Sequence, residues 1–376
     1  MSKILLLSSL LIALFLQGCA TQLPLPEPDQ MDQEVFFDTS WRRGVDGSYG
    51  EYTERFNPVL KGDGIFFVTR RGAVYKLRQT DGRRLNYFVT DYEPSAGVAL
   101  NDDLLYFGTY DAKLVAVSLS TKEVVWERSL TSEILSEPTY NNGFLAVQTG
   151  DGWLSVLDAK TGDTIWRTKE DIPALTVRGT SVPVIVGNKV LAGFADGKLK
   201  AFSLVDGKAL WSYEVGKPKG RYEIERLTDV NGRLVVKGDT VYSVAYNGTL
   251  SALSIETGKL KWQRSIPSAV GVAVKNDQLV IVSQDSSVIA LNALNGTQMW
   301  ENREMEEREL SEPTFFRDYI AVIDRGGFVF LLDPKSGDIK AFKLADTNQK
   351  PGSRMVSNGK QLFILTPDSK VTALSY

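Results

Sequence analysis

The feature that most constrains this 376-residue chain is a short segment that recurs eight times along it. The copies begin at residues 71, 111, 151, 196, 247, 285, 326 and 368, so successive copies lie 38 to 51 residues apart. Each copy opens with a turn pair and then alternates apolar and polar residues, as in "DGKLKAF" from residue 196. Such alternation is typical of a half-buried β-strand. No 3.6-residue period accompanies it, which argues against helical repeats of similar length.

A second motif follows most copies and joins a turn glycine to a tryptophan four residues later. It occurs as "DAKTGDTIW" at 158–166 and again at 203–211, 254–262 and 292–300, whereas 118–126 has Lys122 in place of the glycine. A T-G, D-G or N-G pair between apolar runs predicts a β-hairpin. Because the tryptophan recurs from repeat to repeat, we interpret it as packing between neighbouring sheets rather than as stacking on a cofactor.

Another strand pair precedes each hairpin, as the similar segments 136–152 and 311–327 indicate. Four strands in about 42 residues are the blade of a β-propeller. The eighth copy stops at Tyr376 without a tryptophan-bearing strand, but "EVFFDTSW" at 34–41 supplies one that ends in Trp41. We therefore predict an all-β, eight-bladed propeller of four-stranded blades over residues 35–376. The N- and C-terminal strands close it by sharing one blade, which leaves no gap in the ring.

The N-terminus reads as an export signal. An apolar run from Ile4 to Leu16 is too short to cross a bilayer, and 16–19, "LQGC", resembles the lipobox of bacterial lipoproteins. The resemblance implies removal of residues 1–18 and acylation of Cys19, the only cysteine in the chain. The alternative is an ordinary secretory signal followed by an incidental free thiol. Ala20, where an Asp would signal inner-membrane retention in that class, favours the outer membrane.

A proline-rich tether is predicted at 19–34. Pro24, Pro26 and Pro28 alternate with apolar and acidic residues, and proline favours an extended polyproline II conformation. We expect the folded body to stand off the membrane on this stalk.

Composition argues against several classes of function. The net charge of −3 does not suggest nucleic-acid binding, which favours a basic domain. The chain has no histidine and no G-x-S-x-G motif, so imidazole bases and histidine metal ligands are absent from the sequence. Its one cysteine, Cys19, is expected to carry the lipid, which leaves no thiol nucleophile. We predict no enzyme activity, no cofactor and no metal site. The alternative is a periplasmic dehydrogenase, because the "TGxxxW" repeats also resemble those of quinoproteins that bind pyrroloquinoline quinone at the propeller centre.

Two of the steps between copies are longer than the others, and their extra residues lie at 168–179 and 216–232. With the lipobox, the eight repeats and the tether, "DIPALTVRG" (171–179) and "YEIERLTDVNG" (222–232) resemble the BamB family of the outer-membrane β-barrel assembly machine. The resemblance covers nearly the whole chain. It implies a non-enzymatic, lipid-anchored scaffold that faces the periplasm and aids the insertion of outer-membrane proteins.

In that family the two loops contact a periplasmic POTRA domain of BamA, the barrel-forming insertase. The resemblance places the contacts at Leu175, Val177, Arg178 and Asp229, and a second acidic residue of the family pattern falls on Asn231. From the residues themselves, alternation in 174–178 puts Leu175 and Val177 on one side, and Asp229 either orients Arg178 or pairs with a cation of the partner. The alternative is that Leu175 and Val177 fill the core between blades. Strand edges of the ring are a second possible site, for unfolded barrel clients.

Overall fold

The computed structural model describes residues 25–28, 33–47, 55–177, 179–218, 221–246, 249–266, 271–345, 355–367 and 370–376. It divides the chain into two compact units, Met1–Gln30 and Met31–Tyr376. The predicted signal peptide, Cys19 and most of the tether lie outside the described residues, so these boundaries stay predictions. No helix in the described ranges has the length and apolar character needed to cross a bilayer.

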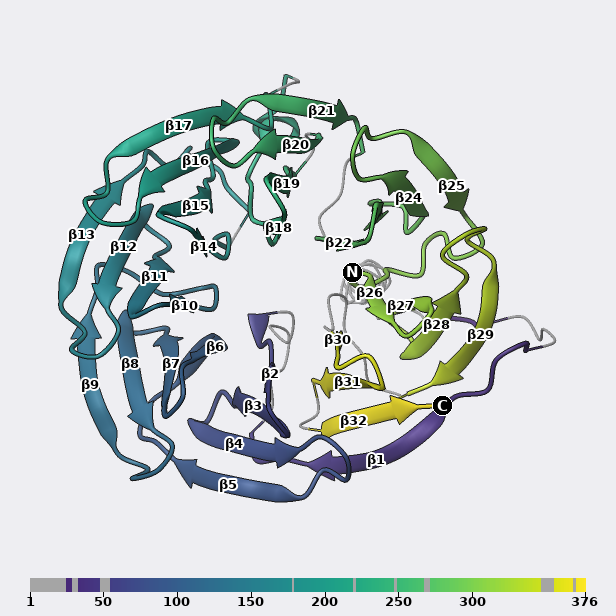
Figure 1. Ribbon diagram of the computed structural model, residues 1–376, viewed down its shortest axis with the longest axis horizontal. Helices are drawn as coiled ribbons and strands as arrows, with labels where there is room; N and C mark the ends of the chain where they lie inside the picture. Colours follow the sequence, from purple (N-terminus) through teal and green to yellow (C-terminus); the bar gives the residue numbers. More distant parts are fainter. Residues whose placement is uncertain are drawn as a thin grey trace, which may run out of the picture. The chain divides into compact units, whose positions relative to one another are not determined.

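The unit Met31–Tyr376 is a ring of eight four-stranded antiparallel sheets (Figure 1). Within each blade the strands follow the order of the chain from the centre of the ring to its circumference, except in the blade that contains both ends. The prediction of an eight-bladed all-β propeller is therefore confirmed.

Blades 1 to 4 lie consecutively in the chain. Blade 1 consists of β2 (Val59–Lys61), β3 (Gly64–Val68), β4 (Ala73–Arg78) and β5 (Arg84–Val89). Blade 2 consists of β6 (Pro94–Leu100), β7 (Leu104–Thr109), β8 (Lys113–Ser118) and β9 (Val124–Ser129). Blade 3 consists of β10 (Thr139–Asn141), β11 (Phe144–Gln148), β12 (Trp153–Asp158) and β13 (Thr164–Lys169). Blade 4 consists of β14 (Val184–Val186), β15 (Lys189–Gly193), β16 (Lys198–Ser203) and β17 (Ala209–Glu214).

Blades 5 to 8 complete the ring. Blade 5 follows the 3-10 helix η2 (Glu223–Arg226) and consists of β18 (Val235–Lys237), β19 (Thr240–Val244), β20 (Leu250–Ser254) and β21 (Leu260–Arg264). Blade 6 consists of β22 (Val272–Lys275), β23 (Gln278–Val282), β24 (Val288–Asn292) and β25 (Gln298–Asn302). Blade 7 consists of β26 (Thr314–Phe316), β27 (Tyr319–Ile323), β28 (Phe328–Leu332) and β29 (Ile339–Leu344). Blade 8 consists of β30 (Met355–Ser357), β31 (Gln361–Thr366), β32 (Lys370–Ser375) and β1 (Asp38–Gly44).

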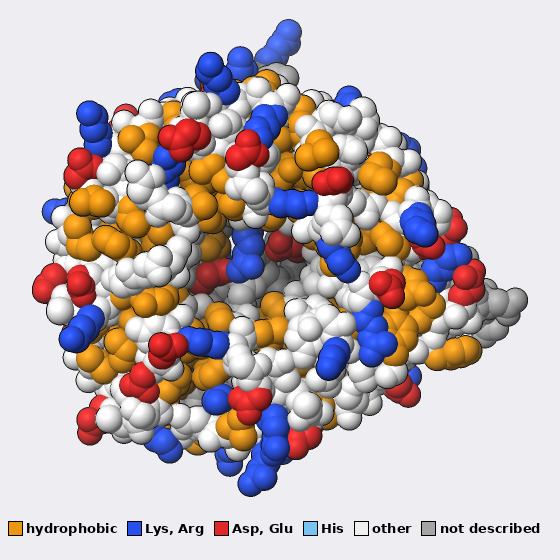
Figure 2. Space-filling view, in the orientation of Figure 1, with side chains coloured by type: hydrophobic (Ala, Val, Ile, Leu, Met, Phe, Trp, Pro, Cys, Tyr) orange, Lys and Arg blue, Asp and Glu red, His pale blue; other side chains and the backbone are white. Residues whose placement is uncertain are grey.

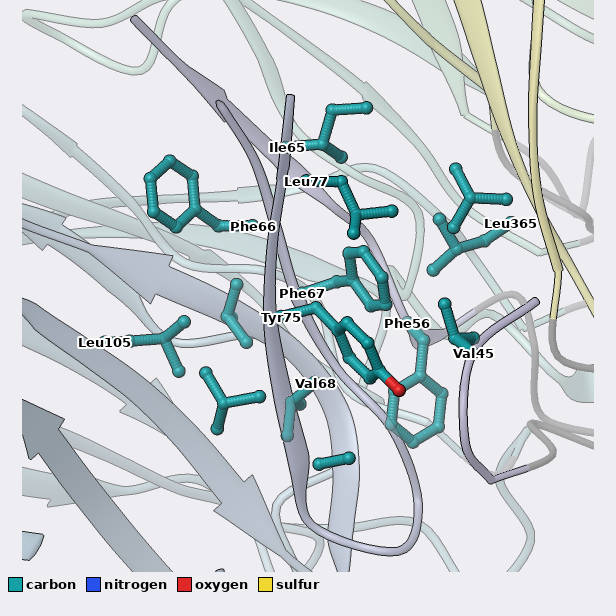
Figure 3. Close-up of a cluster of buried hydrophobic side chains, with 14 of the residues drawn as sticks. Val45, Phe56, Ile65, Phe66, Phe67, Val68, Tyr75, Leu77, Leu105 and Leu365 are labelled. Carbon is teal, nitrogen blue, oxygen red and sulfur yellow. The ribbon is translucent and has the colours of Figure 1, made fainter. Parts of the chain in front are cut away.

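The hydrophobic core lies between blades rather than at the centre of the ring. Middle strands such as β3 are buried along their whole length because a neighbouring blade covers each face. One cluster joins Phe67 of blade 1 to Leu105 of blade 2 and Phe363 of blade 8, and Figure 3 shows part of it, with Phe67 beside Tyr75 and Phe56. Outer strands alternate instead: in β13 only Trp166 is buried. Each blade therefore depends on its two neighbours for burial.

A tryptophan on the outer strand forms the boundary between blades at six places. Its indole N–H donates to a backbone carbonyl oxygen of the following blade: Trp41 to Gln79 (2.9 Å), Trp126 to Ala159 (3.1 Å), Trp166 to Leu204 (2.7 Å), Trp211 to Ile255 (2.9 Å), Trp262 to Ala293 (2.9 Å) and Trp300 to Pro334 (2.7 Å). The indole ring lies on the turn glycine of that following blade. We call these six boundaries the tryptophan seams, and they confirm the packing interpretation of the motif.

The glycine of a seam is required for two reasons. Gly162, for example, has φ +73°, and a Cβ on it would lie 2.7 Å from Cδ2 of Trp126. The left-handed backbone disfavours a side chain, and the close approach of the indole ring leaves no room for one. The motif therefore links two blades: the glycine of one repeat receives the tryptophan of the repeat before it.

The ring closes as predicted. β1 pairs antiparallel with β32, with Trp41 opposite Ala373, and places the N- and C-terminal strands in one sheet. Trp41 then meets Gly82 of blade 1, with a Cβ there 2.4 Å from Cε3 of the ring. The eighth blade is thus joined to the first by the same kind of seam as the internal blades.

The boundaries between blades 1 and 2 and between blades 7 and 8 lack the tryptophan. At each of them the following blade also lacks the turn glycine. Asn86 holds the tryptophan position of blade 1, and its Nδ2 donates to Leu119 O at 2.6 Å, the carbonyl that an indole would reach. Its partner position is Lys122, with φ +66°. Ala341 holds the position in blade 7, where the next blade is completed by β1 and has no hairpin turn. The exception at Lys122 in the sequence thus reflects the loss of the tryptophan one repeat earlier.

Candidate functional site

The two long segments of the sequence are connections between blades. Residues 170–183 join β13 to β14, and residues 215–234 join β17 to β18; we call them the 170–183 loop and the 215–234 loop. The connection from β5 to β6 needs only residues 90–93. The additional residues therefore form structure outside the regular blades.

Side chains of the 215–234 loop hold the backbone of the 170–183 loop at one residue. Oδ1 of Asp229 accepts a hydrogen bond from the N–H of Val177 at 3.0 Å. Nδ2 of Asn231 donates to the carbonyl oxygen of Val177 at 3.0 Å. We call this pair of contacts the Val177 clamp, because one side chain accepts from and the other donates to the same residue.

The segment that carries the clamp is fixed to the ring. Val230 N donates to Phe194 O at 3.1 Å in blade 4, and Tyr246 N donates to Asp229 O at 2.9 Å in blade 5. The Val230 side chain covers Gly193, where a Cβ would lie 2.4 Å from Cγ1 of Val230. Val230 is fully buried. Asp229 and Asn231 therefore project from a rigid support between two blades.

Asp229 is an unusual carboxylate because it is buried. Its exposed fraction is 2%, and burial raises its pKa from 3.8 to about 6, against the lowering effect of hydrogen bonds from backbone N–H groups and Asn231. Its Oδ2 is buried without a hydrogen-bond partner among the described residues. An ion pair with a cation of the partner requires a surface position, whereas the structure buries this carboxylate against Val177. The other predicted role, orienting Arg178, lies outside the described residues.

Leu175 and Val177 of the 170–183 loop are not in the core. Leu175 is 44% exposed, Val177 is half-buried, and neither belongs to a buried cluster between blades. Residues 171–177 form no strand, so the expectation that Leu175 and Val177 share one side through strand alternation is wrong. Arg178 lies outside the described residues, and its role as a contact stays a prediction.

Two exposed residues of these loops were not singled out from the sequence. Ile172 is 41% exposed, and Tyr222, at the start of η2, is 70% exposed. Both lie within the segments 171–179 and 222–232 that carried the family resemblance. The sequence feature that could have identified them is an apolar or aromatic side chain in a segment without strand or helix periodicity.

The centre of the ring is crossed by polar side chains. Nδ2 of Asn57 donates to Oε1 of Glu137 at 2.9 Å, and the guanidinium of Arg233 bonds to the same oxygen. These residues precede β2, β10 and β18, so they come from blades 1, 3 and 5, which are not adjacent. Figure 2 shows the central hollow with Lys or Arg and Asp or Glu side chains on its walls.

This bridge bears on the quinoprotein alternative. That alternative places a planar quinone at the centre of the ring, where these three side chains meet. Among the described residues, no group of three or more Asp, Glu, Cys or His side chains is arranged to hold a metal ion.

Comparisons with known proteins identify the family of this chain. A family model described as outer membrane protein assembly factor BamB matches residues 70–302. The chain is 33% identical over 332 residues to the factor of that name from Pseudomonas aeruginosa (87% of each chain) and 27% identical over 379 residues to that from Yersinia pestis (95% of each).

Among the solved structures, a member of the same family superimposes on this chain. BamB from Moraxella catarrhalis superimposes with a TM-score of 0.81 at 25% identity and covers 91% of this chain and 100% of its own. The quinohemoprotein alcohol dehydrogenase from Comamonas testosteroni reaches a TM-score of 0.71 at 10% identity, over 90% of this chain and 76% of its own. The second likeness concerns the fold alone.

Proposed function

Because the chain belongs to the BamB family of outer membrane protein assembly factors, we propose that it is a non-enzymatic scaffold that binds the periplasmic POTRA region of BamA. The ring is anchored at the outer membrane through acylated Cys19 and faces the periplasm. Its 170–183 and 215–234 loops form the contact surface. In this role it aids the folding and insertion of outer-membrane proteins without a cofactor or a metal.

The observation that supports this proposal is the Val177 clamp. Two loops that interrupt the regular repeat are joined by side chains at 3.0 Å, and the joined loops carry an exposed Leu175. A ring of packed blades has no structural need for this arrangement, because the tryptophan seams already join its blades. Binding residues are commonly carried by loops on a rigid scaffold.

The mechanism is one of proximity. A lipid anchor and an extended tether keep the ring close to the insertase, so docking to the POTRA region occurs at a high effective concentration. The ring then restrains the periplasmic arm of BamA near the membrane where barrels insert.

The test is capture from detergent-solubilised envelopes. The affinity-tagged lipoprotein should retain BamA, and Arg178→Glu, which reverses the charge that the family resemblance assigns to the interface, should lose it. Cys19→Ser with the signal retained should fail to mature and should leave the outer-membrane fraction. A purified protein that carries a quinone absorbance and retains no BamA would instead support the dehydrogenase alternative.

A further inference from the structure

We propose that Asp229 and Asn231 act as positioning residues, which orient the 170–183 loop through the peptide groups of Val177, while exposed apolar side chains of that loop make the contact with the partner. This inference rests on the proposed function, since it divides the roles within the same site. It assigns to the two residues a task that needs hydrogen bonds to the backbone and no charge.

Burial excludes Asp229 from direct contact. With 2% of the residue exposed and its Oδ1 engaged by the N–H of Val177, a cation of the partner could reach the carboxylate only after the loop had moved away. Removing a charge from water without a charged partner is unfavourable. The hydrogen bond to Val177 therefore explains the position of this group better than an ion pair with the partner.

The amide of Asn231 performs a task that an ionised carboxylate cannot. It donates an N–H to the carbonyl oxygen of Val177, whereas an ionised Asp has acceptors only. The change from the acidic residue of the family pattern to Asn231 thus gives this chain a complementary pair: Asp229 accepts and Asn231 donates. Together they fix the orientation of both peptide groups that flank Val177.

The loop contacts blade 3 through Ile172, whose Cγ1 would lie 3.1 Å from a Cβ on Gly152. Beside this contact a cavity of about 40 Å³ is lined by Ile172, Thr176 and Gly179 of the loop, by Gly150 and Phe194 of blades 3 and 4, and by Asn231 of the 215–234 loop. Leu175 belongs to no buried cluster, and 44% of the residue is exposed. The hydrogen bonds to Val177, two residues later, therefore hold the backbone close to it.

The experiment compares four variants of the full-length lipoprotein in detergent, by titration against BamA that carries its POTRA domains. Asp229→Ala removes the acceptor and should weaken binding about tenfold. Asp229→Asn removes the charge and keeps Oδ1 as an acceptor, so binding should stay within about threefold of wild type. Leu175→Ala should weaken binding about tenfold or more. Asp206→Asn, which removes an exposed carboxylate between β16 and β17 of blade 4, is the matched control and should change nothing.

A second measurement separates loop order from contact. In the protein without BamA, hydrogen exchange at the Val177 N–H should become faster in Asp229→Ala and stay slow in Asp229→Asn, with exchange in β12 and β16 unchanged. If Asp229→Ala is partly unfolded, exchange in β12 and β16 will rise as well, and Asn231→Ala then takes its place in the comparison.

The outcomes are distinguishable. If wild type binds BamA and Asp229→Asn loses as much affinity as Asp229→Ala, the charge itself contacts the partner and the positioning role is overturned. If Asp229→Ala binds normally while its Val177 exchange is fast, loop orientation does not matter and the inference is again overturned. If wild type does not bind BamA at all, the proposed function fails instead.

Discussion

The tryptophan seams and the Val177 clamp join neighbouring blades in two different ways. A seam uses a large apolar ring on a glycine and one indole hydrogen bond to a carbonyl, and it recurs at six boundaries. The clamp uses two polar side chains on one backbone residue, and it belongs to the site formed by the two long loops. A feature repeated around the ring serves the ring, whereas a feature confined to one place is free to serve a partner.

The seams and the clamp should also differ in how much they contribute to the free energy of unfolding. Truncating a buried aromatic residue costs about 3–5 kcal/mol, whereas a typical hydrogen bond contributes about 1 kcal/mol net. The fold should therefore tolerate changes in the clamp that it does not tolerate in a seam. Variants of the seams and variants of the clamped loops both test this difference.

The largest effect is expected at the closing seam. Trp41→Ala removes the indole contact with Gly82 and the hydrogen bond to Gln79 O, and the free energy of unfolding should fall by about 3 kcal/mol in urea denaturation. Val205→Ala removes an exposed side chain and, as the control, should stay within about 0.5 kcal/mol of wild type. A Trp41→Ala protein as stable as wild type would mean that the closing seam does not hold the ring.

The next effect concerns the pH dependence of stability. Since the pKa of Asp229 is 3.8 when unfolded and about 6 when buried, the folded state binds its proton more tightly. The stabilisation from protonated Asp229 is complete below about pH 4 and is lost as pH rises through about 6, a change of about 3 kcal/mol. Asp229→Asn should remove this component and be the more stable protein at pH 7. Parallel unfolding profiles of the two proteins between pH 4 and 7 would contradict the burial of this charge.

A smaller effect tests the link between repeats. Asn86→Trp should be destabilising, because the side chain at Lys122 occupies the place where the other seams have glycine. Lys122→Gly alone should stabilise by about 0.5–1 kcal/mol, since it relieves a positive φ. The double variant should recover at least about 1 kcal/mol beyond additivity in a double-mutant cycle. Strict additivity would show that the two positions are not one seam.

Much of the fold could be predicted from the sequence because the repeat supplies eight related copies of one pattern. Alternation, turn glycines and Trp41 were sufficient to predict the blades and their closure. The exception at Lys122 was visible, but its cause lies at Asn86 in the previous repeat, and only the stacking of blades brings the two together.

The site was less predictable. Loop length located it, and the family resemblance named its residues, but strand alternation does not apply to 171–177, which form no strand. Whether a carboxylate is exposed or buried depends on contacts between distant segments, and Asp229 lies 52 positions from Val177. Sequence reasoning therefore left Asp229 either to orient Arg178 or to pair with a cation of the partner, and did not predict its hydrogen bond to the backbone of Val177.

The smallest effect on stability accompanies the most direct test of the central claim, that the clamped loops are the surface that binds BamA. Leu175→Asp places a charge on a 44% exposed side chain outside the core clusters, so the free energy of unfolding should change by no more than about 0.5 kcal/mol. Titration of this full-length variant with BamA that carries its POTRA domains should show at least a tenfold loss of affinity. Lys122→Gly, in the turn between β8 and β9 of blade 2, should bind as wild type does. Wild-type affinity in Leu175→Asp would contradict the claim.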